Sequence, residues 1–126
     1  MRRIDGKLVP EPPGRRVISA QVSQQVRDML KGVLAPGGTA SEVAIDGYHL
    51  AGKTGTANKI DPTTGEYSKS KYVASFVGFA PAENPKLLIA VMVDEPQGDI
   101  FGGSVAAPAF GRIASFALQN LRIPPQ

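Results

Sequence analysis

Four consecutive residues of this sequence, Lys53, Thr54, Gly55 and Thr56, carry groups that could assist acyl transfer. Side chains alternate between the faces of a β-strand, so on a strand Lys53 and Gly55 share one face and the two threonines share the other. A lysine provides a fixed positive charge, threonine hydroxyls can bind a carboxylate, and a backbone N–H near Thr56 can stabilise an oxyanion. The segment therefore predicts one wall of an acyl-transfer site. A turn-rich strand with an exposed lysine is the simpler alternative.

The same segment completes a phosphate-binding pattern, because Gly47–Thr54 reads Gly, four residues, then Gly-Lys-Thr. A P-loop must follow a buried strand and open a helix, so that backbone N–H groups face the phosphates. Here only Val43–Ile45 precede the pattern, and Asn58 and Pro62 follow it where the helix should begin. A nucleotide site is therefore a weak alternative.

Three further groups of residues could be mistaken for catalytic ones. Ser68–Lys71 matches Ser-x-x-Lys, but that motif needs a helix to bring the lysine one turn from the serine. The polar residues 60–70 predict a loop there instead. His49 has no partner fixed by the sequence, and Asp94–Glu95 mark the end of a strand before Pro96. We expect none of them to be catalytic.

A helix is predicted before the Lys-Thr-Gly segment. Apolar residues recur at three- and four-residue spacing from Ser19 to Leu34, with Ser19 as the N-cap and Pro36–Gly38 as the stop. One further turn is expected at Thr39–Val43. The predicted apolar face of the helix consists of Val22, Val26, Met29, Leu30, Val33 and Leu34.

Three strands and a second helix are predicted after it. The strands are expected at Tyr48–Asn58, Tyr72–Ala80 and Leu87–Val93. The third is continuously apolar, which predicts burial on both faces. After a glycine-rich loop at 97–104, a helix begins near Pro108. Its predicted apolar face consists of Phe110, Ile113, Ala114, Ala117 and Leu121.

The order of these elements favours an α+β fold. It predicts an antiparallel sheet of three strands flanked by an N-side helix and a C-terminal helix. Residues 1–16, with a turn signal at Asp5–Gly6 and prolines at 10, 12 and 13, are expected to form an irregular lead-in to the folded part, 17–126.

Composition excludes several classes of protein. The chain has 126 residues, of which 42% are hydrophobic, so one domain with a hydrophobic core is expected. A formal net charge of +3 is too small to indicate nucleic-acid binding. The absence of cysteine and the single histidine exclude a disulfide scaffold, a zinc site and a cysteine nucleophile. No stretch approaches the ~20 apolar residues of a membrane span.

The Lys-Thr-Gly segment and its surroundings resemble the C-terminal part of the transpeptidase domain of class B penicillin-binding proteins, cell-division type. The resemblance rests on Gly52–Ala57 and on segments that follow the family's order between residues 16 and 121. These segments are Arg16–Ser19, Pro36–Ala40, Phe76–Pro81, Asp94–Pro96, Phe101–Gly103 and Val105–Phe110. It implies part of a β-lactamase/transpeptidase-like fold.

The resemblance also implies a ligand and a set of site residues. The ligands would be peptidoglycan stem peptides ending in D-Ala-D-Ala, and the β-lactams that imitate them, with no cofactor or metal. Lys53 and Thr56 would be catalytic. Contacts to the stem peptide or β-lactam would come from Thr54, Gly55, Thr56, Phe101, Gly102 and Gly103.

The family's Ser-x-x-Lys nucleophile and Ser-x-Asn box would precede Lys53, and neither occurs there. The resemblance therefore implies a fragment that is inactive alone and needs the remainder of the transpeptidase domain as its partner. The intact enzyme would act on the extracytoplasmic face of the bacterial cytoplasmic membrane. The alternative is a non-enzymatic module, either a truncated product or one that pairs with another chain.

Overall fold

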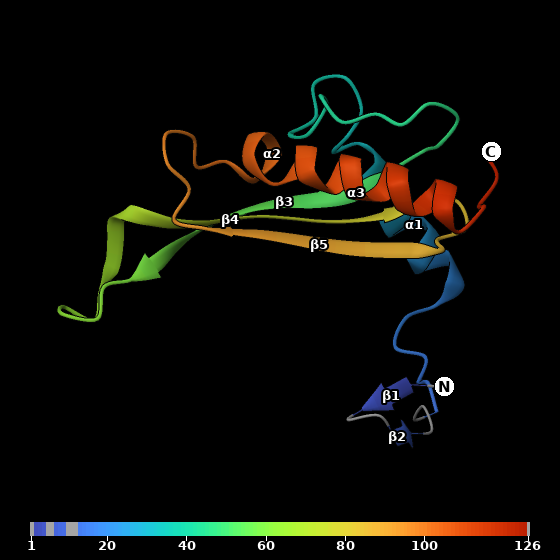
Figure 1. Ribbon diagram of the computed structural model, residues 1–126, viewed down its shortest axis with the longest axis horizontal. Helices are drawn as coiled ribbons and strands as arrows, with labels where there is room; N and C mark the ends of the chain where they lie inside the picture. Colours follow the sequence, from blue (N-terminus) through green and yellow to red (C-terminus); the bar gives the residue numbers. More distant parts are fainter. Residues whose placement is uncertain (1, 5–6, 10–12, 126) are drawn as a thin grey trace.

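The computed structural model describes residues 2–4, 7–9 and 13–125. Its centre is a three-stranded antiparallel sheet in the order β3-β4-β5 (Figure 1). The strands are β3 (Ala51–Ile60), β4 (Tyr67–Ala80) and β5 (Leu87–Asp94). The expected strand order and antiparallel pairing are confirmed.

Helices lie on both faces of this sheet. Short α2 (Gly102–Val105) and long α3 (Ala107–Asn120) cover one face (Figure 1). On the other side, α1 (Ala20–Lys31) and the sheet form a groove that includes Phe79 and Leu88. These helices and the antiparallel sheet confirm the α+β fold class. No helix of the described residues is long and apolar enough to cross a membrane.

The hydrophobic core lies between α3 and the sheet. Its centre is the ring pair of Phe76 and Phe110, whose centroids are 4.8 Å apart at an interplanar angle of 51°. Gly78 lies beneath both rings, where a Cβ atom would come within 2.7 Å of each. The buried residues of α3 are Ala107, Phe110, Ala114 and Leu118. The prediction for this face missed Leu118 and wrongly included Ile113 and Leu121, which are exposed.

The first helix differs from its prediction in length and environment. Ser19 caps it as expected, because its Oγ accepts a hydrogen bond from the Val22 amide. The helix ends at Lys31 rather than Leu34, since Gly32 caps it and the chain then folds back so that Gly38 packs against the Val33 carbonyl. None of its residues is buried. Its apolar face therefore has little covering in the described chain.

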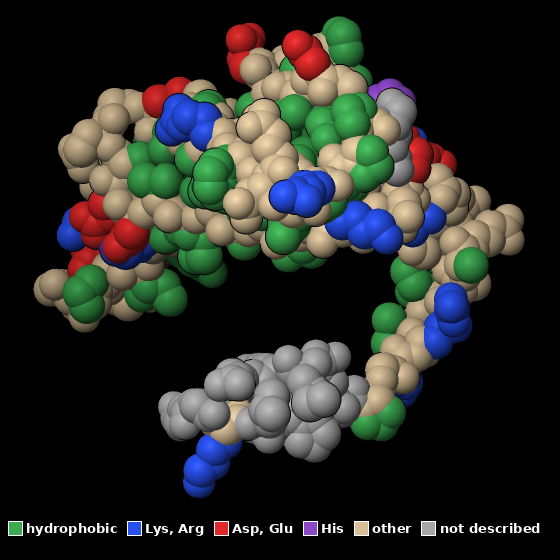
Figure 2. Space-filling model, turned by 45° about the vertical axis from the view of Figure 1, so that its right-hand side comes forward, with side chains coloured by type: hydrophobic (Ala, Val, Ile, Leu, Met, Phe, Trp, Pro, Cys, Tyr) green, Lys and Arg blue, Asp and Glu red, His purple; other side chains and the backbone are tan. Residues whose placement is uncertain are grey.

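Strand β5 is also more exposed than its apolar sequence predicts. Exposure alternates along it, and Leu88 and Met92 are 72% and 73% exposed. The prediction of burial on both faces is wrong, because only the side chains on the α3 side of this edge strand are covered. Figure 2 likewise shows hydrophobic side chains at the surface, among scattered charged ones. Apolar surface on the α1 side is thus left uncovered.

The β3–β4 hairpin is longer than expected. Strand β3 begins at Ala51 instead of Tyr48 and continues to Ile60, and β4 begins at Tyr67 instead of Tyr72. Ser68–Lys71 therefore lies on a strand, not in the predicted loop and not on the helix that a Ser-x-x-Lys motif needs. The glycine-rich loop is shorter than predicted, since α2 begins at Gly102.

The lead-in contains regular structure. Strands β1 (Arg2–Ile4) and β2 (Lys7–Val9) pair antiparallel and lie apart from the main sheet (Figure 1). The turn predicted at Asp5–Gly6 and the prolines at positions 10 and 12 lie outside the described residues.

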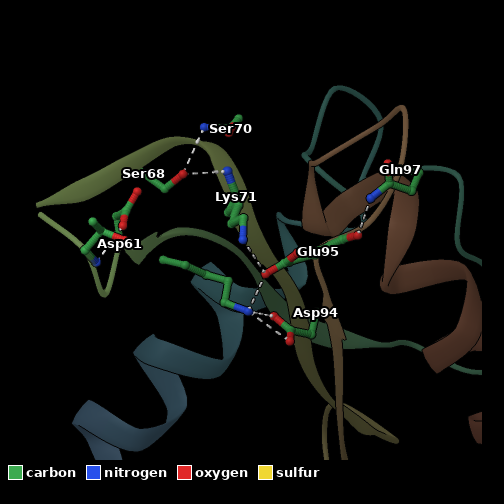
Figure 3. A network of polar contacts seen from close by, with 9 residues as sticks. Asp61, Ser68, Ser70, Lys71, Asp94, Glu95 and Gln97 are labelled. Carbon is green, nitrogen blue, oxygen red and sulfur yellow. Dashed lines mark hydrogen bonds and ion pairs between the residues drawn. The ribbon is translucent and has the colours of Figure 1, made fainter. Parts of the chain in front are cut away.

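An ion-pair network joins the hairpin to the end of β5 (Figure 3). The Lys59 ammonium lies 2.9 Å from an Asp94 oxygen and 2.8 Å from Glu95 Oε1, and the Lys71 ammonium lies 3.8 Å from the same Glu95 oxygen. The hydrogen bond from Lys59 holds the pKa of Glu95 below its ordinary value of 4.5. The network thus fastens β3 to β5 across β4.

This network predicts a pH-dependent stability. The pKa of Glu95 is lower in the folded chain than in the unfolded one. Ionised Glu95 therefore stabilises the folded state at pH values above its unfolded pKa, and this stabilisation is lost as pH falls below about 4.5. We expect the thermal midpoint to fall less between pH 6 and pH 3 in Lys59→Met than in the unmodified chain, by a small amount because these charges are exposed. Lys69→Met is the matched control. Equal pH dependence in all three proteins would contradict the assignment.

Candidate functional site

The side chains of the Lys-Thr-Gly segment alternate between the two faces of β3, as expected for a strand. Thr54 pairs with Phe76 and Thr56 with Ala74, so both threonines lie on the face that α2 and α3 cover. Lys53 pairs with Val77 on the opposite face, which Gly55 shares. Strand β3 is an edge of the sheet. A ligand along this edge would therefore have the threonines on one side and the lysine on the other.

A pocket of about 380 Å³ opens beside the two threonines. Three segments form it: the loop before β3, the strand itself, and the turn into α2. Its lining residues are Thr39, Ala40, Ser41, Glu42, Thr54, Thr56, Phe101, Gly102, Gly103 and Ser104. The structure thus brings together the predicted residues Thr54, Thr56 and Phe101–Gly103.

Hydrogen bonds connect these segments across the pocket. The Thr39 and Thr54 hydroxyl oxygens are 3.0 Å apart, and either can be the donor. The Gly102 amide donates to the Thr56 hydroxyl oxygen over 3.4 Å. Both threonines of β3 are thereby linked to a neighbouring loop, which holds their side chains at the pocket wall.

Two glycines allow the turn into α2 to lie against the strand. A Cβ atom on Gly102 would fall 2.0 Å from the Ser75 carbonyl oxygen, and one on Gly103 would fall 1.9 Å from the Thr39 carbonyl oxygen. Backbone atoms cannot give way by that distance, so any larger residue would push the turn off the sheet. The sequence predicts a ligand beside Gly55, but Ser75 Oγ occupies the space that a Cβ atom on Gly55 would need.

Lys53 does not line this pocket. Its side chain is exposed, and its ammonium donates to the backbone carbonyl of Thr54 over 2.9 Å. The structure therefore places Lys53 next to the threonines along the strand but on the other face, and its catalytic role stays a prediction.

His49 has the carboxylate partner that the sequence could not identify. Its Nδ1 lies 2.8 Å from Glu83 Oε1, and the Lys31 ammonium lies 3.2 Å from the same oxygen. Burial opposes ionisation of Glu83, but hydrogen bonds from its own backbone, Lys31 and His49 lower its pKa overall. The contacts tie α1 to the start of β3. This arrangement is structural and lies outside the threonine pocket.

The nucleotide alternative is contradicted by the same local structure. Gly47 lies in a turn with a positive φ of 78°, and the chain from Ala51 onward is strand where a P-loop needs a helix. The backbone N–H groups therefore do not form a cradle for phosphates.

Sequence reasoning missed five lining residues, Thr39, Ala40, Ser41, Glu42 and Ser104. The sequence did contain a signal for Thr39. Gly38 directly precedes it in a turn-forming segment, where a close approach of two backbone segments is common. Five hydroxyls line the pocket and can donate to an anion, and Glu42 is the one charged side chain in this lining. No hydrogen bond joins these hydroxyls to a lysine or histidine within the described part of the chain, so none is activated as a nucleophile.

Comparisons with known proteins identify the family of the chain. The family model for the penicillin-binding protein transpeptidase domain matches residues 1–115. A probable peptidoglycan D,D-transpeptidase, PenA of Neisseria flavescens, is 40% identical over 96% of this chain and 32% of its own length. The peptidoglycan D,D-transpeptidase FtsI of Escherichia coli K12 is 41% identical over 94% of this chain and 20% of its own length. The chain thus spans a third or less of these curated relatives.

Solved structures are similar over nearly the whole chain. The transpeptidase domain of Burkholderia pseudomallei penicillin-binding protein 3 matches with a TM-score of 0.80 and 42% identity. The match covers 99% of this chain and 37% of the solved chain. Penicillin-binding protein 3 of Mycobacterium tuberculosis in complex with ampicillin has a TM-score of 0.82 and 38% identity, over 95% of this chain and 28% of its own. The same protein has also been solved with aztreonam.

Proposed function

The chain belongs to the penicillin-binding protein transpeptidase family, and from that premise we propose that it forms one wall of a peptidoglycan D,D-transpeptidase active site. The observation that carries the proposal is the pocket beside Thr54 and Thr56, with the Gly102 amide bonded to Thr56. Hydroxyls and amide N–H groups are the donors that a carboxylate needs. The cell-division type is proposed because FtsI is among the relatives.

Each residue of the segment has a proposed role. Thr54 and Thr56 bind the C-terminal carboxylate of a stem peptide ending in D-Ala-D-Ala, or the carboxylate of a β-lactam. The Thr56 amide donates to the oxyanion, since its strand edge is unpaired in the described chain. Lys53 adds positive charge and takes part in proton transfer from the other face of β3. Gly55 and Phe101–Gly103 contact the stem peptide or β-lactam, and Gly102 also lets the turn into α2 lie against the backbone of Gly55.

The nucleophile of this reaction is proposed to lie outside the chain. A serine oxygen attacks the penultimate D-Ala carbonyl, the C–N bond to the terminal D-Ala breaks, and that D-Ala leaves with a proton. The acyl group then passes to an amine of a second stem peptide. A carboxylate clamp and an oxyanion donor without the serine form no acyl-enzyme, so the chain alone is inactive.

The partner that completes the site is the remainder of the transpeptidase domain. The groove between α1 and the sheet contains Val26, Leu30, Phe79 and Leu88, and further apolar side chains lie open on this side of the molecule. Apolar surface of this kind marks an interface. We place the complete enzyme on the extracytoplasmic face of the bacterial cytoplasmic membrane, where its peptidoglycan substrate lies. A non-enzymatic pairing module would use the same apolar surface without catalysis.

Substitution of Thr56 tests the carboxylate site. In an NMR titration with diacetyl-Lys-D-Ala-D-Ala, we expect the amides of Thr54, Thr56 and Gly102 to shift, and Thr56→Val to weaken binding about tenfold. Valine keeps the shape of the side chain and removes only the hydroxyl. Thr64→Val, at the exposed hairpin tip, is the control. A second peptide carries a C-terminal amide in place of the carboxylate. If it binds with equal affinity, or if Thr56→Val binds the carboxylate peptide as tightly as the unmodified chain, the proposal is contradicted.

A further inference from the structure

We infer that Thr39 is a positioning residue of this site, which acts by orienting the hydroxyl proton of Thr54 toward the bound carboxylate. The inference rests on the proposed function, because it needs Thr54 to contact that carboxylate. It adds a residue that lies fifteen positions before Thr54, ahead of β3 and outside the Lys-Thr-Gly segment.

The contact between the two hydroxyls carries the inference. Their oxygens are 3.0 Å apart, and both side chains line the same pocket. Each hydroxyl has one proton to donate and two lone pairs that can accept. If Thr54 donates to Thr39, its proton is used and its oxygen presents lone pairs to an anion. If Thr39 donates to Thr54, the Thr54 proton is free to point at the carboxylate.

A bound carboxylate selects the second arrangement. Its oxygens accept hydrogen bonds and cannot donate, so Thr54 must be the donor toward it. The Thr39 proton then satisfies the Thr54 oxygen, and the chain runs from Thr39 to Thr54 to the carboxylate. Successive hydrogen bonds of one direction polarise one another, which strengthens the bond to the anion.

The backbone around Thr39 is fixed well enough for this role. The Ala40 amide donates to the Val33 carbonyl over 2.9 Å, and Ala40 is 2% exposed. On the other side, the Gly38 amide donates to the Ala35 carbonyl over 2.8 Å. The Thr39 carbonyl itself packs against Gly103, where no Cβ atom would fit. A side chain held on such a backbone keeps its partner at a constant distance.

A double-substitution cycle tests the inference in the chain itself, with the same peptide probe. We expect Thr39→Val to weaken binding of diacetyl-Lys-D-Ala-D-Ala about threefold to tenfold, and Thr39→Ser to retain the affinity. Because Thr39 acts through Thr54, Thr39→Val should have no further effect in a Thr54→Val background. The peptide that carries a C-terminal amide in place of the carboxylate should bind all variants with the same affinity. An unchanged thermal midpoint of the free Thr39→Val protein shows that the loop is intact.

The outcomes separate this inference from the proposed function. Loss of affinity in Thr56→Val but not in Thr39→Val would overturn the inference and leave the carboxylate site standing. An equal loss from Thr39→Val with and without the Thr54 hydroxyl would also overturn it, because Thr39 would then contact the ligand directly. Absence of peptide binding by the unmodified chain would overturn both.

Discussion

Lys53→Ala is expected to reduce acylation by ampicillin at least about 100-fold in a chimera that contains a complete site. In this chimera the chain replaces the matching 37% of the transpeptidase domain of Burkholderia pseudomallei penicillin-binding protein 3. Alanine removes the ammonium group that we propose for proton transfer beside the serine. The side chain is exposed, and within residues 2–4, 7–9 and 13–125 its one hydrogen bond goes to the Thr54 carbonyl, so the fold should be unaffected.

The control for Lys53 is Lys69→Ala, which removes an exposed lysine from the adjacent strand β4. It changes net charge by the same amount and lies away from the threonine pocket. The rate of acylation is measured by intact mass at several times after ampicillin is added. If Lys53→Ala acylates within about threefold of the unmodified chimera, the proposed role is wrong.

Phe110→Ala is expected to lower the free energy of unfolding of the chain by about 3–5 kcal/mol. The Phe110 ring is completely buried, pairs with Phe76 and covers Gly78. Alanine would leave a cavity between α3 and the sheet that these residues cannot fill. A loss of that size is a large part of the stability of a domain this small. Urea denaturation measures it.

Phe116→Ala is the matched control, since Phe116 lies on the same helix but is 70% exposed. It should change the free energy of unfolding by less than about 0.5 kcal/mol. A similar loss in both variants would contradict this prediction, because burial of Phe110 against Phe76 would then not be what stabilises this layer; helix propensity cannot cause such a loss, since alanine is the better helix former.

The sequence predicted the parts of the fold that depend on local spacing. Alternation along one strand was enough to separate Lys53 from Thr54 and Thr56, and Ser19 was identified as a helix cap. The apolar spacing of the last helix located Phe110 in the core. The motif segment, together with the segments around it between residues 16 and 121, was also enough to identify the family, which the comparisons confirm.

The parts that it missed depend on distant residues. The apolar residues of β5 predicted burial on both faces, but what covers Leu88 and Met92 is not a property of their own sequence. The longer hairpin is supported by Lys59, whose partners Asp94 and Glu95 come 35 and 36 positions later. Thr39 reaches Thr54 only because its loop folds back over the sheet.

The most direct test of the account is intact mass spectrometry of the chain alone and of the chimera after ampicillin treatment, followed by peptide mapping. The central claim is that this chain provides the carboxylate and oxyanion wall of a transpeptidase site whose nucleophile lies elsewhere. It predicts no adduct on the chain alone, and one adduct on the chimera, at a serine outside the residues of this chain. An adduct on any residue of this chain, or a chimera that is never acylated, would contradict it.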